Sequence, residues 1–306
     1  MITLREEPAN LGKKPEEGSL EELLQYGVVP VNKPIGPTSH EVSAFVRKLL
    51  HLKKTGHTGT LDADVSGVLL VLLENSCKVA KFLLGGKKRY VCIMELWEKK
   101  KRQEVEAAFS NFRGKIYQTP PLESAVVKKL RVREIFELKL LDLDQNLVLF
   151  DCECEAGTYI RKLCYDVGEV LGCGARMKEL RRTKASGVDE KDCIKLQDLS
   201  DFYWLWKEKK DEAELRKSIL PVEKVVDLKK VIASDFALPS ICRGANLAIP
   251  GVLSFDENVK KGDFVSVFSG KGGLVCIARA LMDADEIREK EKGLAFDIER
   301  VVHSFK

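Results

Sequence analysis

A change of pattern near residue 227 divides this chain of 306 residues into two parts that must fold differently. Beyond it the segments are short, and turn residues separate them at Gly244, Pro250, Gly251, Gly262, Gly270, Gly272 and Gly273. Closely spaced glycine and proline between short runs are typical of a small β-rich domain. Because 306 residues also exceed the usual size of one domain, we expect a large domain followed by a smaller one.

We expect three segments along the chain. Residues 1–27 form an N-terminal arm that lies on another surface, because its glycines and prolines break any long helix and only residues 19–26 have helical character. Residues 28–228 form the large domain and residues 229–306 the small one. The boundary falls at residues 225–229, after the break at Leu220 and Pro221.

Strands and helices interleave in the large domain. Residues 28–31 are strand-like, residues 40–50 are helical, and the apolar run at 68–73 precedes a helical stretch through Phe82. Alternation over residues 147–154 predicts a strand, and apolar residues from 160 to 171 follow helical spacing. Gly157 is therefore expected at a strand-to-helix turn.

The composition is that of a globular chain, with 44% hydrophobic and 32% charged residues. No window approaches the ~20 apolar residues of a membrane helix, and the N-terminus lacks an apolar signal core, so we expect a cytoplasmic protein without membrane contact. None of the nine cysteines forms a C-x-x-C pair, so the sequence indicates neither a metal site nor a disulfide framework.

The net charge of +4 says little alone, but the basic residues are concentrated. They gather in four runs, at residues 85–89, 98–102, 127–133 and 178–182. Each run taken singly is best interpreted as a solvated surface. Four runs around one candidate site favour contacts with nucleic-acid phosphates.

The segment GHTGTLDADVSGVL (56–69) places Asp62 in a glycine-rich loop that enters a buried apolar strand. An isolated aspartate there would be interpreted as a cap of backbone N–H groups in a turn. The segment is not a phosphate-binding loop, because G-x-x-x-x-G-K-[ST] is absent. Three further segments favour a functional site over a structural turn. They are NKPIGPTSHEV (32–42), KKRYV (87–91) and AGTYIRKL (156–163), which occur with the Asp62 segment in a fixed order.

Together these segments resemble the ordered motifs of TruB/dyskerin-type RNA pseudouridine synthases, and the tail from Cys242 to Met282 resembles a PUA RNA-binding domain. The likeness is strongest to the archaeal form that depends on a guide RNA. It implies an α+β fold, with a mixed, largely antiparallel sheet in the catalytic domain, and no cofactor. It also implies as partners guide RNA, substrate tRNA or rRNA, and small H/ACA proteins: a zinc-ribbon protein, a Gar-type β-barrel protein and a kink-turn RNA-binding protein.

The resemblance also implies roles for residues at the site. Asp62 would be the nucleophile, Arg161 its bidentate partner, and Tyr90 would stack on the extruded uracil. His57, Tyr159 and Leu180 would line the pocket, and Lys33 would support the catalytic loop. By spacing alone, Tyr90, Tyr159 and Leu180 would be core residues and Arg161 a surface residue of a helix.

RNA contacts are expected at two places. Lys128, Lys129, Arg131 and Arg133 lie in a basic segment, entered through Pro120 and Pro121, that would clamp the substrate strand. Arg243 and Gly244, in the small domain, would contact a single-stranded RNA end. Two positions depart from the family pattern: Ala63 replaces a proline, which is expected to loosen the Asp62 loop, and Arg89 replaces an acidic residue.

The sequence leaves three functions open. The chain is a guide-dependent catalytic subunit, a stand-alone synthase of the tRNA T-loop, or an RNA-binding scaffold that has lost catalysis. The arm and the PUA-like tail favour the first, Ala63 keeps the third open, and the retention of Asp62, Tyr90 and Arg161 argues against it.

Overall fold

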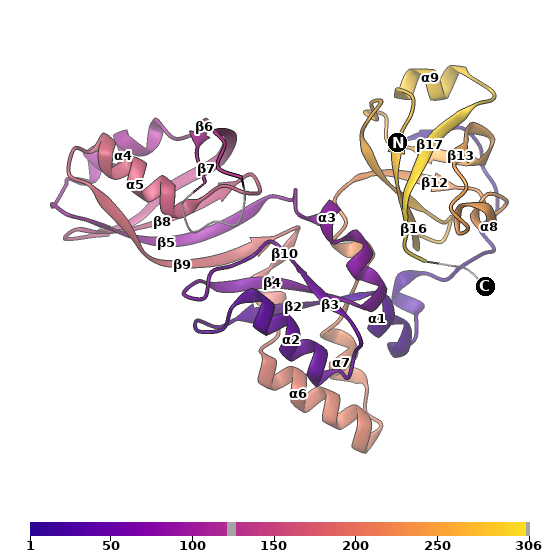
Figure 1. Cartoon of the computed structure of the whole chain (residues 1–306), viewed down its shortest axis with the longest axis horizontal. Coiled ribbons are helices and arrows are strands. Elements are labelled where there is room, and N and C mark those ends of the chain that lie inside the picture. Colours follow the sequence, from indigo (N-terminus) through magenta and orange to yellow (C-terminus); the bar gives the residue numbers. More distant parts are fainter. Residues whose placement is uncertain (121–126, 304–306) are drawn as a thin grey trace.

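The computed structural model describes residues 1–120 and 127–303, which form two β-sheets with helices packed against them (Figure 1). Over these residues the larger sheet has ten strands and the smaller has seven. The α+β fold expected from the sequence is confirmed. Within the same residues no helix is both long and apolar enough to cross a membrane.

Most neighbours in the larger sheet are antiparallel, and its main strand order is β11-β2-β4-β9-β5-β8-β7-β6. Its strands are β2 (Gly27–Lys33), β3 (Thr55–Thr58), β4 (Ser66–Leu73), β5 (Lys88–Leu96), β6 (Gly114–Gln118), β7 (Arg131–Asp144), β8 (Leu147–Cys154), β9 (Ala175–Ala185), β10 (Val188–Asp189) and β11 (Leu220–Pro221). The exception is the parallel pair β4–β9, which joins the two halves of the sheet.

Strand β4 shows why its apolar run is continuous. Leu69, Val71 and Leu73 face a core formed with α1, α2, α6 and α7. Val68, Leu70 and Leu72 face the opposite core, which the small domain completes. A strand buried on both faces needs an unbroken apolar sequence rather than an alternating one.

Helices cover the larger sheet in two groups, as Figure 1 shows. The group around β2 and β4 comprises α1 (Leu20–Tyr26), α2 (Ser39–Leu49), α3 (Ala80–Leu83), α6 (Leu196–Trp204) and α7 (Ala213–Lys217). Two others, α4 (Arg102–Ser110) and α5 (Ile160–Val170), pack on the half containing β5, β7, β8 and β9. The ring of Phe109 in α4 meets that of Phe150 in β8 edge-on at 5.4 Å. The apolar spacing of α5 thus buries the face that carries Leu163, Cys164 and Val167.

The smaller sheet comes from both ends of the chain. Its strands are β1 (Ile2–Thr3), β12 (Lys229–Ala233), β13 (Leu247–Ala248), β14 (Val252–Phe255), β15 (Phe264–Phe268), β16 (Leu274–Ala280) and β17 (Leu294–Val301), with α8 (Leu238–Ile241) and α9 (Ala284–Glu289) beside them. Ile2 pairs with Phe255, so the start of the arm is an edge strand of this sheet. The boundaries at residues 28 and 229 stay a prediction.

The two domains share an apolar core. Phe268, Leu274, Ile277 and Val302 of the small domain lie in one cluster with residues of β2, β4 and the helical stretch through Leu83. Beside it, the rings of Phe82 and Phe264 meet at 5.1 Å. Separating the domains would expose this apolar surface to water, which costs roughly 25 cal/mol of free energy for each Å² exposed.

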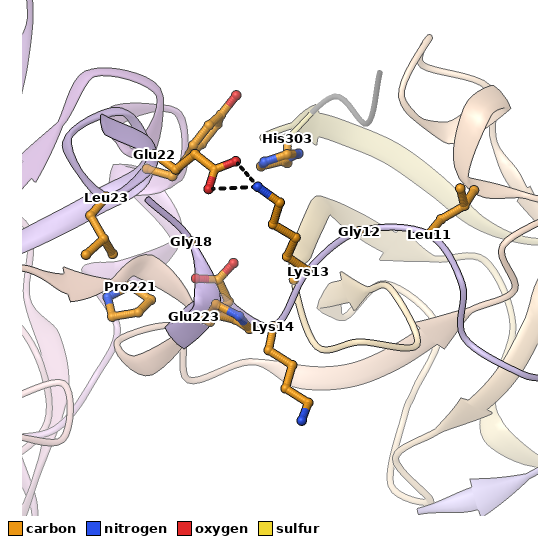
Figure 2. A pocket seen from close by; sticks show the side chains of 13 residues that line it. Leu11, Gly12, Lys13, Lys14, Gly18, Glu22, Leu23, Pro221, Glu223 and His303 are labelled. Carbon is orange, nitrogen blue, oxygen red and sulfur yellow. Dashed lines mark hydrogen bonds and ion pairs between the residues drawn. The ribbon is translucent and has the colours of Figure 1, made fainter. Parts of the chain in front are cut away.

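The arm bridges the two domains after β1. The backbone N–H groups of Asn10 and Leu11 donate to Asp235, at 2.6 and 2.9 Å. Helix α1 then begins with a reciprocal cap between Ser19 and Glu22. A cavity of about 560 Å³ lies between the arm, α1 and the small domain, and Lys13 pairs with Glu22 on its wall at 3.2 Å. Figure 2 shows the side chains that line it.

Candidate active site

Asp62 lies in the loop between β3 and β4, and buried side chains hold the loop on both sides of it. The hydroxyl of Ser39, on α2, accepts from the N–H of Leu61 at 2.8 Å and donates to its carbonyl at 2.9 Å. The ammonium of Lys33 is fully buried and donates to the carbonyl of Val65 at 2.7 Å. The backbone on both sides of Asp62 is therefore fixed while its side chain stays exposed.

The carbonyl of Ala63 is held by tertiary contacts. It accepts two hydrogen bonds, from the N–H of Gly36 at 2.9 Å and from Lys33 at 3.3 Å. These contacts restrict the backbone at the position where the family usually has proline. Whether alanine loosens the loop at this position stays a prediction.

Arg161 forms an ion pair with Asp62. It is the second residue of α5, which follows the Gly157 turn, where φ is +78°. The two side chains are 42% and 55% exposed, so the pair opens to solvent and leaves room for a substrate. The pairing joins the β3–β4 loop to the start of α5, which lie about a hundred residues apart in the sequence.

Tyr90 projects from β5 into the core beside the site and is 7% exposed. Burial raises the pKa of its phenol above the ordinary value, and the neighbouring Arg182 guanidinium opposes that rise. Arg182 lies directly across from Tyr90 in the β5–β9 pairing. Tyr90 thus lies in the core that contains Leu61, with Arg182 beside it.

Arg182 is a residue of the site that the sequence analysis missed. It is 1% exposed and donates to the carbonyl of Gly59 at 2.9 Å and to that of Val68 at 2.8 Å. Among the ion pairs found between described residues, none contains Arg182. Its guanidinium therefore fixes the start of the Asp62 loop through carbonyl groups.

Lys88, on β5, is a second buried cation. Burial, reinforced by the charge of Arg182, lowers the pKa of Lys88 to about 8. Its ammonium donates to the carbonyls of Leu84 and Gly86, at 3.1 and 2.8 Å.

The interpretation of the runs at 85–89 and 178–182 as phosphate contacts is wrong for Lys88 and Arg182, because both are buried. The signal in the sequence was alternation, which places Lys88 with Tyr90 and Arg182 with Leu180 on the inner face.

The other predicted pocket residues come from three elements. His57, on β3, is partly buried with its ring edge-on to that of His40 at 4.7 Å, and burial lowers its pKa. Tyr159 is the N-cap residue of α5. Leu180, on β9, packs against the core that contains Leu61 and Tyr90. No group of three or more His, Cys, Asp or Glu within residues 1–120 and 127–303 is arranged to hold a metal ion.

Four of the predicted RNA-binding residues lie at the start of β7 and just before it. Lys128 and Lys129 are exposed, and Arg131 donates to the carbonyl of Val127 at 3.3 Å. Arg133 instead contacts the turn before α5, donating to the carbonyl of Gly157 at 3.3 Å. Pro121 lies outside the described residues.

The small domain carries the remaining two predicted RNA contacts. Arg243 and Gly244 are exposed in the turn after α8, and Gly244 has a φ of +90°.

Arg89, on the outer face of β5, pairs with Asp151 at 2.9 Å and with Glu137 at 3.3 Å. Its charge is therefore offset by local carboxylates.

Four family models match successive parts of the chain: the DKCLD domain (3–43), the N-terminal domain of the TruB family of pseudouridylate synthases (47–160), the C-terminal domain of tRNA pseudouridylate synthase B (161–227) and the PUA domain (229–302). A probable tRNA pseudouridine synthase B of Archaeoglobus fulgidus is 49% identical, over 95% of this chain and 90% of that protein. That of Methanocaldococcus jannaschii is 48% identical, over 95% and 87%.

Solved structures agree with these matches. A chain from a Cbf5-Nop10-Gar1 complex superposes with a TM-score of 0.94 at 42% identity, covering 99% of this chain and 94% of that one. A chain from an H/ACA RNP bound to a substrate RNA containing 2′-deoxyuridine gives 0.91 at 40% identity, covering 97% and 92%. The chain belongs to the TruB family of pseudouridylate synthases. It is an RNA pseudouridine synthase, an isomerase.

Proposed function

We propose that this chain is the catalytic subunit of a guide-RNA-directed H/ACA particle and that Asp62 is its catalytic carboxylate. The observation that carries the proposal is the Asp62–Arg161 ion pair, which opens to solvent on a loop fixed by buried side chains. The likeness to chains solved in H/ACA complexes extends over nearly the whole chain and supports the assembly.

The reaction makes limited chemical demands. Converting uridine to pseudouridine breaks the N1–C1′ bond, rotates the uracil and joins C5 to C1′, with no net redox change. Asp62 already forms an ion pair with Arg161, so it needs positioning more than activation. Arg161 supplies this positioning, and Tyr90 supports the extruded base. Attack at C1′, attack at C6 and abstraction of the C2′ proton all stay open for Asp62.

RNA would be bound by two surfaces on this account. The basic residues of the β6–β7 hairpin, Lys128, Lys129 and Arg131, would contact the substrate strand, and the exposed turn at Arg243 and Gly244 would contact the guide. Arg133 contributes less to RNA binding than the sequence suggests, because its guanidinium is engaged with Gly157 and Glu155.

The partners follow from the related structures. Small H/ACA proteins are the partners expected from the sequence, and the first of those complexes contains Nop10 and Gar1. We extend both to this chain, together with guide and substrate RNA and a kink-turn RNA-binding protein reached through the RNA. A cytoplasmic location stays a prediction.

One assay separates the three functions. Tritium release from C5-labelled uridine is measured with the chain alone, with guide RNA, and with guide RNA plus partner proteins. Release on an rRNA-like target only in the presence of guide and partners supports the proposal. Equal release from tRNA by the chain alone supports the stand-alone enzyme, which the names of the curated relatives favour. No release under any condition would contradict the assignment as an active synthase and leave only the scaffold.

A further inference from the structure

Gln118, the last residue of β6, is buried against the start of α5 and is 2% exposed. Its side-chain carbonyl accepts from the N–H of Tyr159 at 2.9 Å, and its amide nitrogen donates to the carbonyl of Tyr159 at 3.1 Å. The orientation of the amide is set by these partners, because a backbone N–H only donates and a carbonyl only accepts. Glutamine thus holds both polar groups of one backbone residue.

This contact replaces a missing helix cap. Tyr159 is the N-cap residue of α5, and no side-chain cap bond forms there. Tyrosine is a poor N-cap because its hydroxyl cannot reach back to the first turn, so N–H groups at the helix start need partners from elsewhere. Gln118, on strand β6, accepts the hydrogen bond from the N–H of Tyr159.

The second strand of the same hairpin holds the preceding turn. Arg133, on β7, donates to the carbonyl of Gly157 at 3.3 Å and pairs with Glu155 at 3.4 Å. A Cβ added to Gly157 would lie 3.2 Å from the Arg133 guanidinium, so the two are in close contact. Both strands of the β6–β7 hairpin therefore form hydrogen bonds to the segment that leads into Arg161.

We propose that Gln118 is a positioning residue for the isomerisation: it fixes the start of α5 and thereby aims Arg161 at Asp62. It does not touch the reacting atoms. The same hairpin carries the basic residues assigned to substrate RNA, so the placement of the hairpin and that of Arg161 are coupled through Gln118. This inference rests on the proposed roles of Asp62 and Arg161.

The test compares Gln118→Met, which removes both hydrogen bonds, with Gln118→Glu, which keeps the acceptor and removes the donor. Gln103→Met, at an exposed site on α4, is the matched control. Each full-length variant is assembled with guide RNA and partner proteins. The single-turnover rate at saturating enzyme, the RNA affinity and the folded fraction at the assay temperature are measured.

We expect Gln118→Met to be about 10- to 100-fold slower per folded molecule, because small misplacements of catalytic groups have effects of that size. Gln118→Glu should also be slow, because its buried carboxylate would face the carbonyl of Tyr159. Gln103→Met should be unchanged, and RNA affinity should be preserved in all three. A rate within about twofold of the parent for Gln118→Met, or a slower rate that disappears once the folded fraction is corrected, would overturn the inference.

A double variant tests whether Gln118 acts through Arg161. In an Arg161→Lys background, followed over a long incubation, adding Gln118→Met should slow the reaction by no more than about twofold, because the group being aimed is already gone. If the two effects multiply in full, Gln118 acts elsewhere and the inference is wrong. Full activity of Arg161→Lys alone would instead remove the proposed site, which is a separate result.

Discussion

Arg161 and Asp62 form their ion pair from two elements that the fold holds independently, the start of α5 and the β3–β4 loop. The loop is fixed by Ser39 and Lys33 and the helix start by Gln118. Neither side chain is buried, so the pair is free to exchange partners when a nucleotide enters. Its geometry is thus set by the surrounding backbone rather than by its own packing.

Replacing Arg161 by lysine should slow catalysis by roughly 100-fold, the scale expected when a preorganised charged donor at a reacting centre is removed. Lysine keeps the charge but not the planar fork that can engage both carboxylate oxygens. Arg176→Lys is the matched control, because Arg176 likewise pairs with a carboxylate, that of Glu95, away from the site. Single-turnover rates measure the effect. A near-parental rate for Arg161→Lys would make Arg161 a structural residue.

Lys88 gives a prediction about stability at alkaline pH. Its pKa of about 8 in the folded chain lies below its ordinary value of 10.5. Between these values the unfolded chain binds the proton and the folded chain does not. The free energy of unfolding therefore gains a contribution that rises with pH, by at most about 1.4 kcal/mol per unit. Below pH 8 both states are protonated and the full cost of burying the charge remains.

Lys88→Met should remove this rise, so the difference in stability between parent and variant should change between about pH 8 and 10 and be constant below pH 7. Denaturant unfolding at several pH values measures it. Lys87→Met, at an exposed neighbour, is the control and should leave the slope unchanged. A difference that is independent of pH would show that Lys88 titrates normally.

The shared core changes how the role of the small domain is tested. Deleting residues 229–306 would expose the apolar surface under Phe268 and Ile277 and remove the partner of β1, so weaker RNA binding could reflect misfolding. Arg243→Glu avoids this problem because Arg243 is exposed.

Arg243→Glu should weaken guide-RNA binding and lower the log–log salt slope by about 0.7 to 0.9 for each phosphate that is no longer neutralised. The rate on RNA already bound should stay the same, because no group assigned to catalysis lies in this domain. Arg288→Glu, exposed on α9 of the same domain, is the control. Binding is titrated at several salt concentrations. Unchanged affinity and slope for Arg243→Glu would remove this turn from the RNA-binding surface.

The sequence predicted the parts of the site that depend on local patterns. The apolar run at 68–73 indicated a buried strand after Asp62, and alternation followed by helical spacing placed the turn at Gly157. The burial of Lys88 and Arg182 was missed because lysine and arginine are rarely buried. The backbone carbonyls that accept hydrogen bonds from Arg182 belong to Gly59 and Val68, more than a hundred residues away in the sequence. Such partners depend on the β4–β9 and β5–β9 pairings, which local patterns do not define.

The central claim, that Asp62 is the catalytic carboxylate, is tested most directly by the single-turnover rate of Asp62→Asn in the assembled particle. Asparagine preserves the shape of the side chain and removes the charge, so fold and RNA affinity should match the parent while product formation is abolished. Asp64→Asn, two residues along and also outside the buried core, is the control and should remain active. Appreciable pseudouridine from pure Asp62→Asn protein would contradict the account.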